Sequence, residues 1–189
     1  MLAIEVLRAE HEGVLVVLTE LERAATAAER GALVPRDIFT DIQEFFTVFV
    51  DRCHHGKEEA ELFPRLGGGA DAAIVQALAQ EHDSGRQLAA AYAAAVRSYA
   101  PGDRWSGARL ARASRDYAEL LRVHIERETR ELFPAMAGSL AAEDDRLVTA
   151  FERLEEEQIG AGTHERLHAM IDTLPARIAP WVRTPALAE

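Results

Sequence analysis

Hydrophobic residues recur along the chain at alternating steps of three and four, the spacing that places them on one face of an α-helix. The alternation typical of β-strands is missing, so the pattern predicts an all-α protein. Two of these apolar stripes contain a histidine. The first stripe is Ile4, Leu7, His11, Val14, Leu18 and Leu21, and the second is Val75, Leu78, His82, Gly85, Ala89, Tyr92 and Val96.

Turn-forming residues at 31–35, 67–69, 101–103 and around Gly138 divide the helical pattern into segments. The first four segments are roughly 25 to 33 residues long, and two shorter helical segments follow. Long amphipathic helices with short connections predict an antiparallel up-down-up-down four-helix bundle over residues 1–137. We expect residues 138–189 to form a C-terminal helical extension packed on the same domain.

The strongest signal in the sequence is an internal repeat. The motif H-x3-E-x2-E-L-F-P occurs twice, 70 residues apart, beginning at His54 and at His124. Residues four apart on a helix lie one above the other, so His54 pairs with Glu58 and His124 pairs with Glu128. Each pair offers an imidazole nitrogen and a carboxylate in one direction, which suits a metal ion.

The first and third segments repeat a shorter element. The dipeptide Glu10-His11 returns as Glu81-His82, 71 residues later. Each half of the bundle therefore supplies one helix with a histidine and one helix with His-x3-Glu. Residues 1–66 and 71–137, approximately, read as two pseudo-repeats of one helical hairpin, related by a pseudo-twofold axis.

If the apolar stripes face the bundle axis, four imidazoles and two carboxylates converge on one interior volume. Burying such groups without partners costs several kcal/mol for each ion, and a bound metal removes that cost. Carboxylates spanning two sites suit a dinuclear centre, and nitrogen and oxygen ligands without thiolate favour iron or manganese, with zinc as a further option. The predicted metal ligands are His11, His54, Glu58, His82, His124 and Glu128.

These motifs resemble the hemerythrin-like, or HHE cation-binding, domains over roughly residues 1–137. The resemblance implies two non-haem iron ions, joined by an oxo or hydroxo bridge and enclosed by a four-helix bundle. It also implies that Glu58 and Glu128 bridge the two ions. The four histidines of the predicted set would complete the protein ligands.

Two departures distinguish the chain from the oxygen-storage members of marine invertebrates. Arg86 stands four residues after His82, where those proteins have a second histidine, and Glu128 stands where they have an aspartate at wider spacing. The resemblance therefore points to the bacterial branch of the family. That branch has been associated with oxygen or redox sensing, nitric oxide and peroxide chemistry, and iron handling.

Two six-coordinate irons need about 12 ligand positions, of which the predicted residues and the bridge fill about ten. Three side chains are candidates for a further ligand: His55, which points about 100° away from His54 around a helix, His164 in the C-terminal segment, and Tyr117. A histidine in the position of His55 is more often an exposed polar residue, and a tyrosine in the position of Tyr117 is more often a core residue. A further protein ligand would leave one position for a diatomic bound end-on, whereas two open positions would let a substrate bridge the irons.

Three functions follow as hypotheses. The first is a diiron protein that binds O2, NO or peroxide in oxygen or redox sensing or in a stress response. The second is a diiron enzyme that decomposes peroxide or reduces NO, as a catalase-like or NO-reducing activity. The third is a metal-free or zinc-filled structural bundle that acts through its acidic surface.

Charge and composition restrict the partners. The chain has 32 acidic and 21 basic residues, a formal charge of -11, which argues against nucleic acid. It has no run of about 18 apolar residues and no signal-peptide start, so we expect a cytoplasmic protein without membrane contact. The single cysteine, Cys53, excludes an intramolecular disulfide. The C-terminal extension either caps the bundle or forms a homodimer contact.

Overall fold

The computed structural model describes residues 1–182, and every regular element in that range is a helix, which confirms the all-α prediction. Elements labelled η are π-helices, apart from η4, a 3₁₀-helix. The elements in chain order are α1 (Leu2–Glu29), α2 (Arg36–Phe45), η1 (Phe46–His55), η2 (Glu58–Leu62), α3 (Phe63–Leu66), α4 (Ala72–Ser98), α5 (Arg104–Arg127), η3 (Glu128–Leu132), α6 (Phe133–Ser139), η4 (Ala141–Glu143), α7 (Asp144–Ile159) and α8 (Thr163–Val182).

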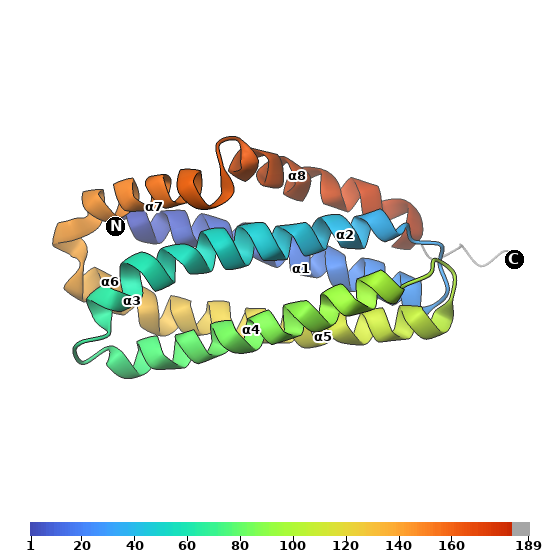
Figure 1. The fold of residues 1–189 in the computed structure, drawn as a ribbon, viewed down its shortest axis with the longest axis horizontal. Helices are drawn as coiled ribbons and strands as arrows, with labels where there is room; N and C mark the ends of the chain where they lie inside the picture. The colour runs from blue at the N-terminus through green and yellow to red at the C-terminus, as the bar shows by residue number, and fades with distance from the viewer. Residues whose placement is uncertain (183–189) are drawn as a thin grey trace, which may run out of the picture.

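Four long helical segments lie side by side: α1, the run from α2 to α3, α4, and the run from α5 to α6 (Figure 1). The connections that follow α1 and α4 lie at one end of the molecule, and the connection that follows α3 lies at the other end. Helix α5 packs against both α1 and α4. None of the helices in residues 1–182 combines the length and the apolar content that a membrane span requires.

The C-terminal extension runs along the outside of these segments. Helix α7 contacts α1 and η1, and α8 contacts α1 and α2 (Figure 1). Phe151 of α7 and Leu174 of α8 are buried in the hydrophobic core. The described part of the extension therefore contributes to the same packed interior as the helices before it.

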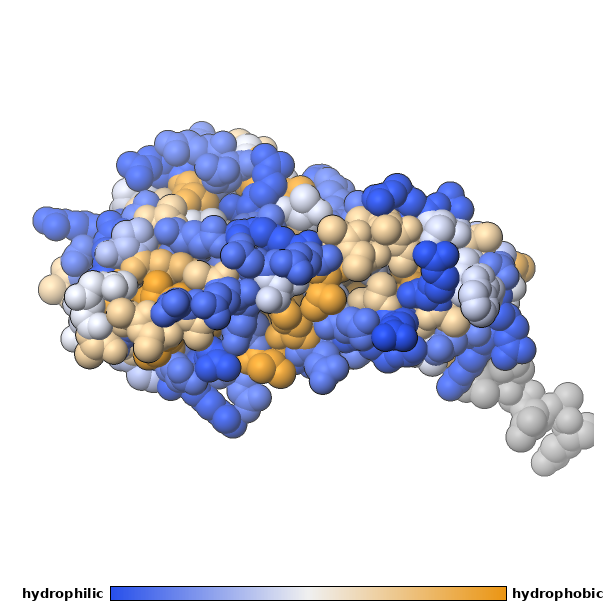
Figure 2. Space-filling view, turned by 60° about the horizontal axis from the view of Figure 1, so that its bottom comes forward, coloured by the Kyte–Doolittle hydropathy of each residue, from blue (hydrophilic) through white to orange (hydrophobic). Residues whose placement is uncertain are grey.

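The core consists of two hydrophobic clusters, and the predicted histidines lie between them. Along α1, Leu7 belongs to the smaller cluster and Val14 to the larger one, with His11 in between. Along α4, Leu78 and Tyr92 flank His82 in the same way. A polar layer thus lies between the two hydrophobic clusters. Outside, charged side chains dominate, with hydrophobic patches between them (Figure 2).

The helices that carry the His-x3-Glu motifs are not α-helical throughout, because each contains π-helical segments. The backbone N–H of Phe63 donates to the carbonyl of Glu58, and that of Phe133 donates to the carbonyl of Glu128, five residues back in each case. The proline that follows each phenylalanine lacks an N–H and clashes with the carbonyl four residues before it. The preceding turn therefore widens into a π-helix, a form frequent at functional sites.

Helices α1 and α5 are in close backbone contact at Gly107. A Cβ atom on this glycine would lie 2.3 Å from the carbonyl oxygen of Ala28. We expect Gly107→Ala to lower the free energy of unfolding by about 1–3 kcal/mol, because the backbones must separate. Gly138→Ala is the control, since a Cβ atom there meets nothing within 4 Å. Urea unfolding that finds the two variants equally stable would contradict this close contact.

Candidate metal centre

The six predicted side chains are all buried, with at most 4% of each residue exposed. Their potential ligand atoms form two groups, and within each group these atoms lie within 4.8 Å of one another. Glu128 is common to both groups. The first group is His11, His54 and Glu128, and the second is Glu58, His82, His124 and Glu128.

Glu128 lies between the two groups. Its Oε2 is 2.9 Å from Nε2 of His11, and its Oε1 is 2.9 Å from Nε2 of His124. In the first group, Nε2 of His11 and Nε2 of His54 are 3.1 Å apart. The two oxygens of one carboxylate thus face histidines of different groups, as a bridging carboxylate requires.

Glu58 lies between the same groups from the other side. Its Oε1 is 3.9 Å from Nε2 of His54, and its Oε2 is 3.2 Å from Nε2 of His82. Burial and the charge of Glu128 raise the pKa of the Glu58 carboxyl. Two carboxylates in a dry interior repel each other, and this repulsion is relieved by a cation between them.

Several atoms of this cluster have no hydrogen-bond partner in the part of the chain that the structure describes. They are both carboxylate oxygens of Glu58 and Glu128, and Nε2 of His82 and His124. A buried polar atom left without a partner costs about 1–3 kcal/mol, and more when it is charged. Metal ions would satisfy all of these atoms together, so the residues fit a cation-binding site.

Three of the four histidines are oriented by a carboxylate on the far side of the ring. In each pair Nδ1 donates to the carboxylate, so the lone pair of Nε2 points into the cluster. The imidazoles are thereby held in the tautomer that binds metal. The pairs are His54 with Glu10 (2.8 Å), His82 with Glu59 (2.7 Å) and His124 with Glu81 (2.9 Å).

Sequence reasoning missed these orienting glutamates, although the repeated Glu-His dipeptide was a signal for two of them. In each half the dipeptide glutamate binds the histidine of the His-x3-Glu motif on the next helix. It also pairs with a cation of that helix, which is Lys57 for Glu10 and Arg127 for Glu81. Lys57 is fully buried and pairs in addition with Glu155 of α7. Burial raises the pKa of Glu10, but His54 and Lys57 outweigh it and lower this pKa to about 2.

The phenylalanine of each L-F-P sequence covers a histidine from another helix. Phe133 stacks on His11 with ring centroids 5.5 Å apart, and Phe63 stacks on His82 at 5.4 Å. These rings cover faces of the two histidines with apolar surface. They also restrict the rotation of the imidazoles.

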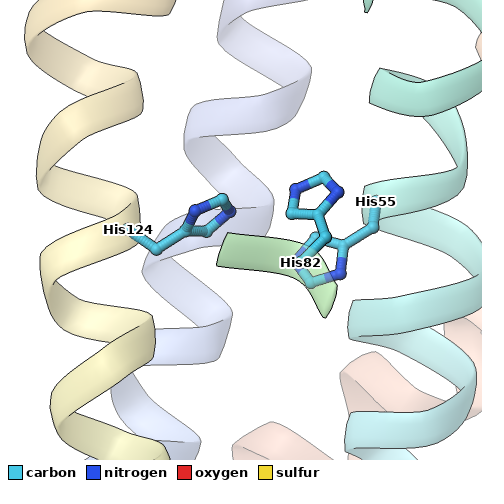
Figure 3. A group of neighbouring side chains, drawn as sticks. All are labelled: His55, His82 and His124. Carbon is cyan, nitrogen blue, oxygen red and sulfur yellow. The ribbon is translucent and has the colours of Figure 1, made fainter. Parts of the chain in front are cut away.

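The expectation that His55 is an exposed polar residue is wrong. His55 is 4% exposed and stacks on His82 with ring centroids 3.9 Å apart. Burial, together with the neighbouring His82 and His54, lowers its pKa to about 3, although the Asp51 carboxylate opposes this shift. The imidazole is therefore neutral, and it lies with His82 and His124 in a third group of potential ligand atoms (Figure 3).

The other two candidate ligands lie apart from the two main groups. Nε2 of His164 is 3.9 Å from the carboxylate of Glu10 and 3.8 Å from that of Glu155, beside the buried lysine. Tyr117 is a core residue, as its commoner role predicts, and packs edge-on against Phe46 with centroids 4.6 Å apart.

A cavity of about 190 Å³ adjoins the cluster, and His55 and Tyr117 both line it. Arg86 lines it as well, and its guanidinium binds Asp51 at 2.8 Å and Glu59 at 2.7 Å. Since Glu59 also holds His82, Arg86 connects the wall of the cavity to the histidine cluster. The cavity can admit a molecule of a few atoms.

Comparison with known proteins agrees with this geometry. The family model of the hemerythrin HHE cation-binding domain matches residues 2–136. No curated protein and no solved structure shows a significant match. The matched region contains all six buried histidines and glutamates of the two groups and ends before α7 and α8. Because the match covers more than half of the chain, the protein belongs to the hemerythrin HHE cation-binding family.

Proposed function

We propose that the protein holds two non-haem iron ions, joined by an oxo or hydroxo bridge, inside an up-down-up-down four-helix bundle. The observation that carries the proposal is the position of Glu128, whose two oxygens face histidines of two different ligand groups. A carboxylate that is shared in this way fits one dinuclear site better than two independent mononuclear sites. The second carboxylate, Glu58, completes the pair.

In this proposal His11 and His54 hold one ion and His82 and His124 hold the other. Histidine nitrogens and carboxylate oxygens without thiolate favour iron over softer metals. Cys53 contributes no thiolate, because burial raises its pKa to about 12 and keeps it protonated. Glu10, Glu59 and Glu81 orient the ligand rings.

We propose that the iron pair binds O2, NO or peroxide in sensing or in a stress response. When bound, the irons supply the affinity for such a ligand and the capacity to exchange electrons with it. The protein supplies a small cavity beside His55 and apolar cover from Phe63 and Phe133. These features favour a small, compact ligand over an extended substrate.

A diiron enzyme that decomposes peroxide or reduces NO is the second candidate. The observation that favours it is the lining of the cavity, where the Tyr117 phenol and the Arg86 guanidinium lie near the cluster. Either group can donate a hydrogen bond to a small oxygenated molecule. Steady peroxide or NO consumption by the iron-loaded protein supports the enzyme, and reversible uptake without turnover supports the binding protein.

Anaerobic loading of the metal-free protein with Fe(II) tests the proposal. We expect about two irons per chain after removal of loosely bound metal, because the two ligand groups share carboxylates. Exposure to air should then give the visible absorption of an oxygen-bridged ferric pair. Zinc loading under the same conditions is the comparison. A chain that retains zinc but less than one iron would instead support the structural bundle.

A further inference from the structure

The cavity that adjoins the histidine cluster extends from the surface into the interior. The exposed residues Thr47 and Ala90 line it together with the buried residues His55 and Tyr117. The six predicted ligands are each at most 4% exposed, so a metal ion from solvent needs a path to reach them. This cavity leads to a side chain that touches the cluster, because His55 stacks on His82.

His55 is not oriented as a ligand of an ion held by His82. The two rings are nearly parallel, with an interplanar angle of 17° and centroids 3.9 Å apart. The lone pair of an imidazole nitrogen lies in the plane of the ring, so stacked rings do not converge on one ion. Both nitrogens of His55 are nevertheless buried and have no hydrogen-bond partner in residues 1–182. A buried polar atom without a partner destabilises the fold, which makes His55 a residue in need of a ligand.

Asp51 lies beside His55 on the same helix, η1, and both residues line the cavity. Oδ1 of Asp51 is 3.8 Å from Nδ1 of His55, which is beyond hydrogen-bond distance. Bonds from a metal ion to nitrogen and oxygen are about 2.0–2.2 Å long, so one ion fits between two atoms at this separation. The two side chains therefore have the chemistry and the spacing of a two-residue grip on a cation.

The second half of the sequence repeat has no such pair. The residues 70 positions after Asp51 and His55 are Leu121 and Ile125, and both belong to the hydrophobic core. The packing of the repeated hairpin therefore does not require polar side chains at these two positions. A carboxylate and an imidazole that occur on one side of the cluster alone point to a ligand.

Negative charge surrounds the cavity at this point. Arg86 binds Asp51 at 2.8 Å, Glu59 at 2.7 Å and Asp83 at 3.2 Å, so one guanidinium faces three carboxylates. The excess of negative charge attracts cations and raises their local concentration. The Arg86 side chain is 38% exposed, so its guanidinium can move into solvent and leave its carboxylates to an incoming ion.

We propose that Asp51 and His55 form an entry site for divalent metal ions, through which iron passes from the cavity to the buried centre. The inference rests on the proposed dinuclear centre and goes beyond it, because neither residue is a ligand of the final ion pair. Since the protein supplies two ligands and water supplies the others, the entry site holds an ion weakly and releases it. The ion then passes the His55 ring and reaches His82 and His124, whose potential ligand atoms lie within 4.8 Å of a nitrogen of His55 (Figure 3).

The experiment is the uptake of Co(II) by the metal-free protein in a stopped-flow spectrophotometer, followed through the visible absorption of bound Co(II). The test variants are Asp51→Asn and His55→Phe, the second of which keeps an aromatic ring against His82. We expect each to slow uptake by about tenfold or more, the effect of a charged entrance on association rates. The final Co(II) content should equal that of wild type.

Asp83→Asn is the matched control. It removes the same charge and also frees a bond of Arg86, but Asp83 is exposed and does not line the cavity. We expect its uptake rate to stay within about twofold of wild type, because salt screens an exposed charge. An equal slowing in Asp83→Asn would overturn the inference, because the effect would then belong to surface charge and not to a site.

Wild-type uptake rates in Asp51→Asn and His55→Phe would overturn the inference as well. So would a lower final Co(II) content in Asp51→Asn, because Asp51 would then be a ligand of the resident centre. Asp51 is partly exposed, so Asp51→Asn keeps the test decisive even if His55→Phe does not fold. Fewer than two Co(II) per wild-type chain would instead refute the dinuclear centre, and the uptake rates would still decide the entry site.

Discussion

Glu128→Ala is expected to abolish most of the metal binding at both sites, whereas Glu58→Ala should weaken binding at the second group more than at the first. The difference follows from the geometry, because the oxygens of Glu128 lie 2.9 Å from histidines of both groups, whereas those of Glu58 lie 3.2 Å from His82 and 3.9 Å from His54. Each site that is filled at 100 times its Kd adds about 2.7 kcal/mol to the free energy of unfolding. Glu128→Ala should lose this gain at both sites. Iron analysis and thermal unfolding with and without iron measure the two effects.

The metal-free form separates lost binding from damaged folding. Glu128→Ala also leaves a cavity and removes the carboxylate beside His11 and His124, so we expect some loss of stability without metal, and thermal unfolding of the metal-free variant measures that part separately. Glu126→Ala is the matched control, because Glu126 is exposed and pairs with the exposed Arg130 at the surface. Full iron content in Glu128→Ala would contradict the shared-carboxylate geometry.

Lys57→Met is expected to lower the free energy of unfolding by about 3–5 kcal/mol, the cost of breaking a buried ion pair from one side. Lys57 is fully buried between Glu10 and Glu155, and its removal leaves Glu10 as an uncompensated charge. Because Glu10 holds Nδ1 of His54, we also expect weaker iron binding. Denaturant unfolding and an iron titration measure the two losses.

The repeat offers a matched control for this variant. Arg127 stands at the corresponding position of the second half, but its side chain is 36% exposed and its pair with Glu81 reaches solvent. We expect Arg127→Met to cost under about 1 kcal/mol. Adding Glu10→Gln to Lys57→Met should recover part of the lost stability, because it removes the buried carboxylate charge that Lys57 no longer compensates. Equal losses of unfolding free energy in Lys57→Met and Arg127→Met would show that the burial of Lys57 does not increase its contribution to stability.

Lys57 also connects the C-terminal extension to the histidine cluster. Glu155 lies in α7, outside the region matched by the family model, yet it reaches Lys57 and through it Glu10 and His54. The extension thus contributes a charged group to the network that orients a histidine of the cluster. Nothing in the local sequence around Glu155, an acidic run typical of a solvated helix, distinguishes it from its neighbours.

The helical class and the six clustered residues could be read from the chain because their signals are local. A stripe such as Leu7, His11 and Val14 indicates which face of its own helix is buried. The repetition of the motif that contains His54 and Glu58 indicates that the arrangement occurs twice. The burial of these side chains agrees with that pattern. Their role as ligands remains a prediction that the iron analysis tests.

Contacts between helices could not be read in the same way. Glu10 lies 44 residues before His54, and the hydrogen bond between them depends on the rotation and the axial position of two separate helices. His55 shows the same limitation within one helix. In a regular α-helix it points about 100° away from His54. In the structure both imidazoles are buried, because η1 contacts α1 on the side of His54 and α4 on the side of His55.

Periodicity and repetition are properties of neighbouring residues, so the helices, their buried faces and the two matched His-x3-Glu motifs follow from the chain without knowledge of its packing. Which carboxylate orients which histidine, the burial of Lys57 and the contact of His55 with His82 and His124 are visible only once the helices are packed. Each of these features is a contact between groups far apart along the chain. Packing against the other helices sets such contacts, and no local pattern encodes them.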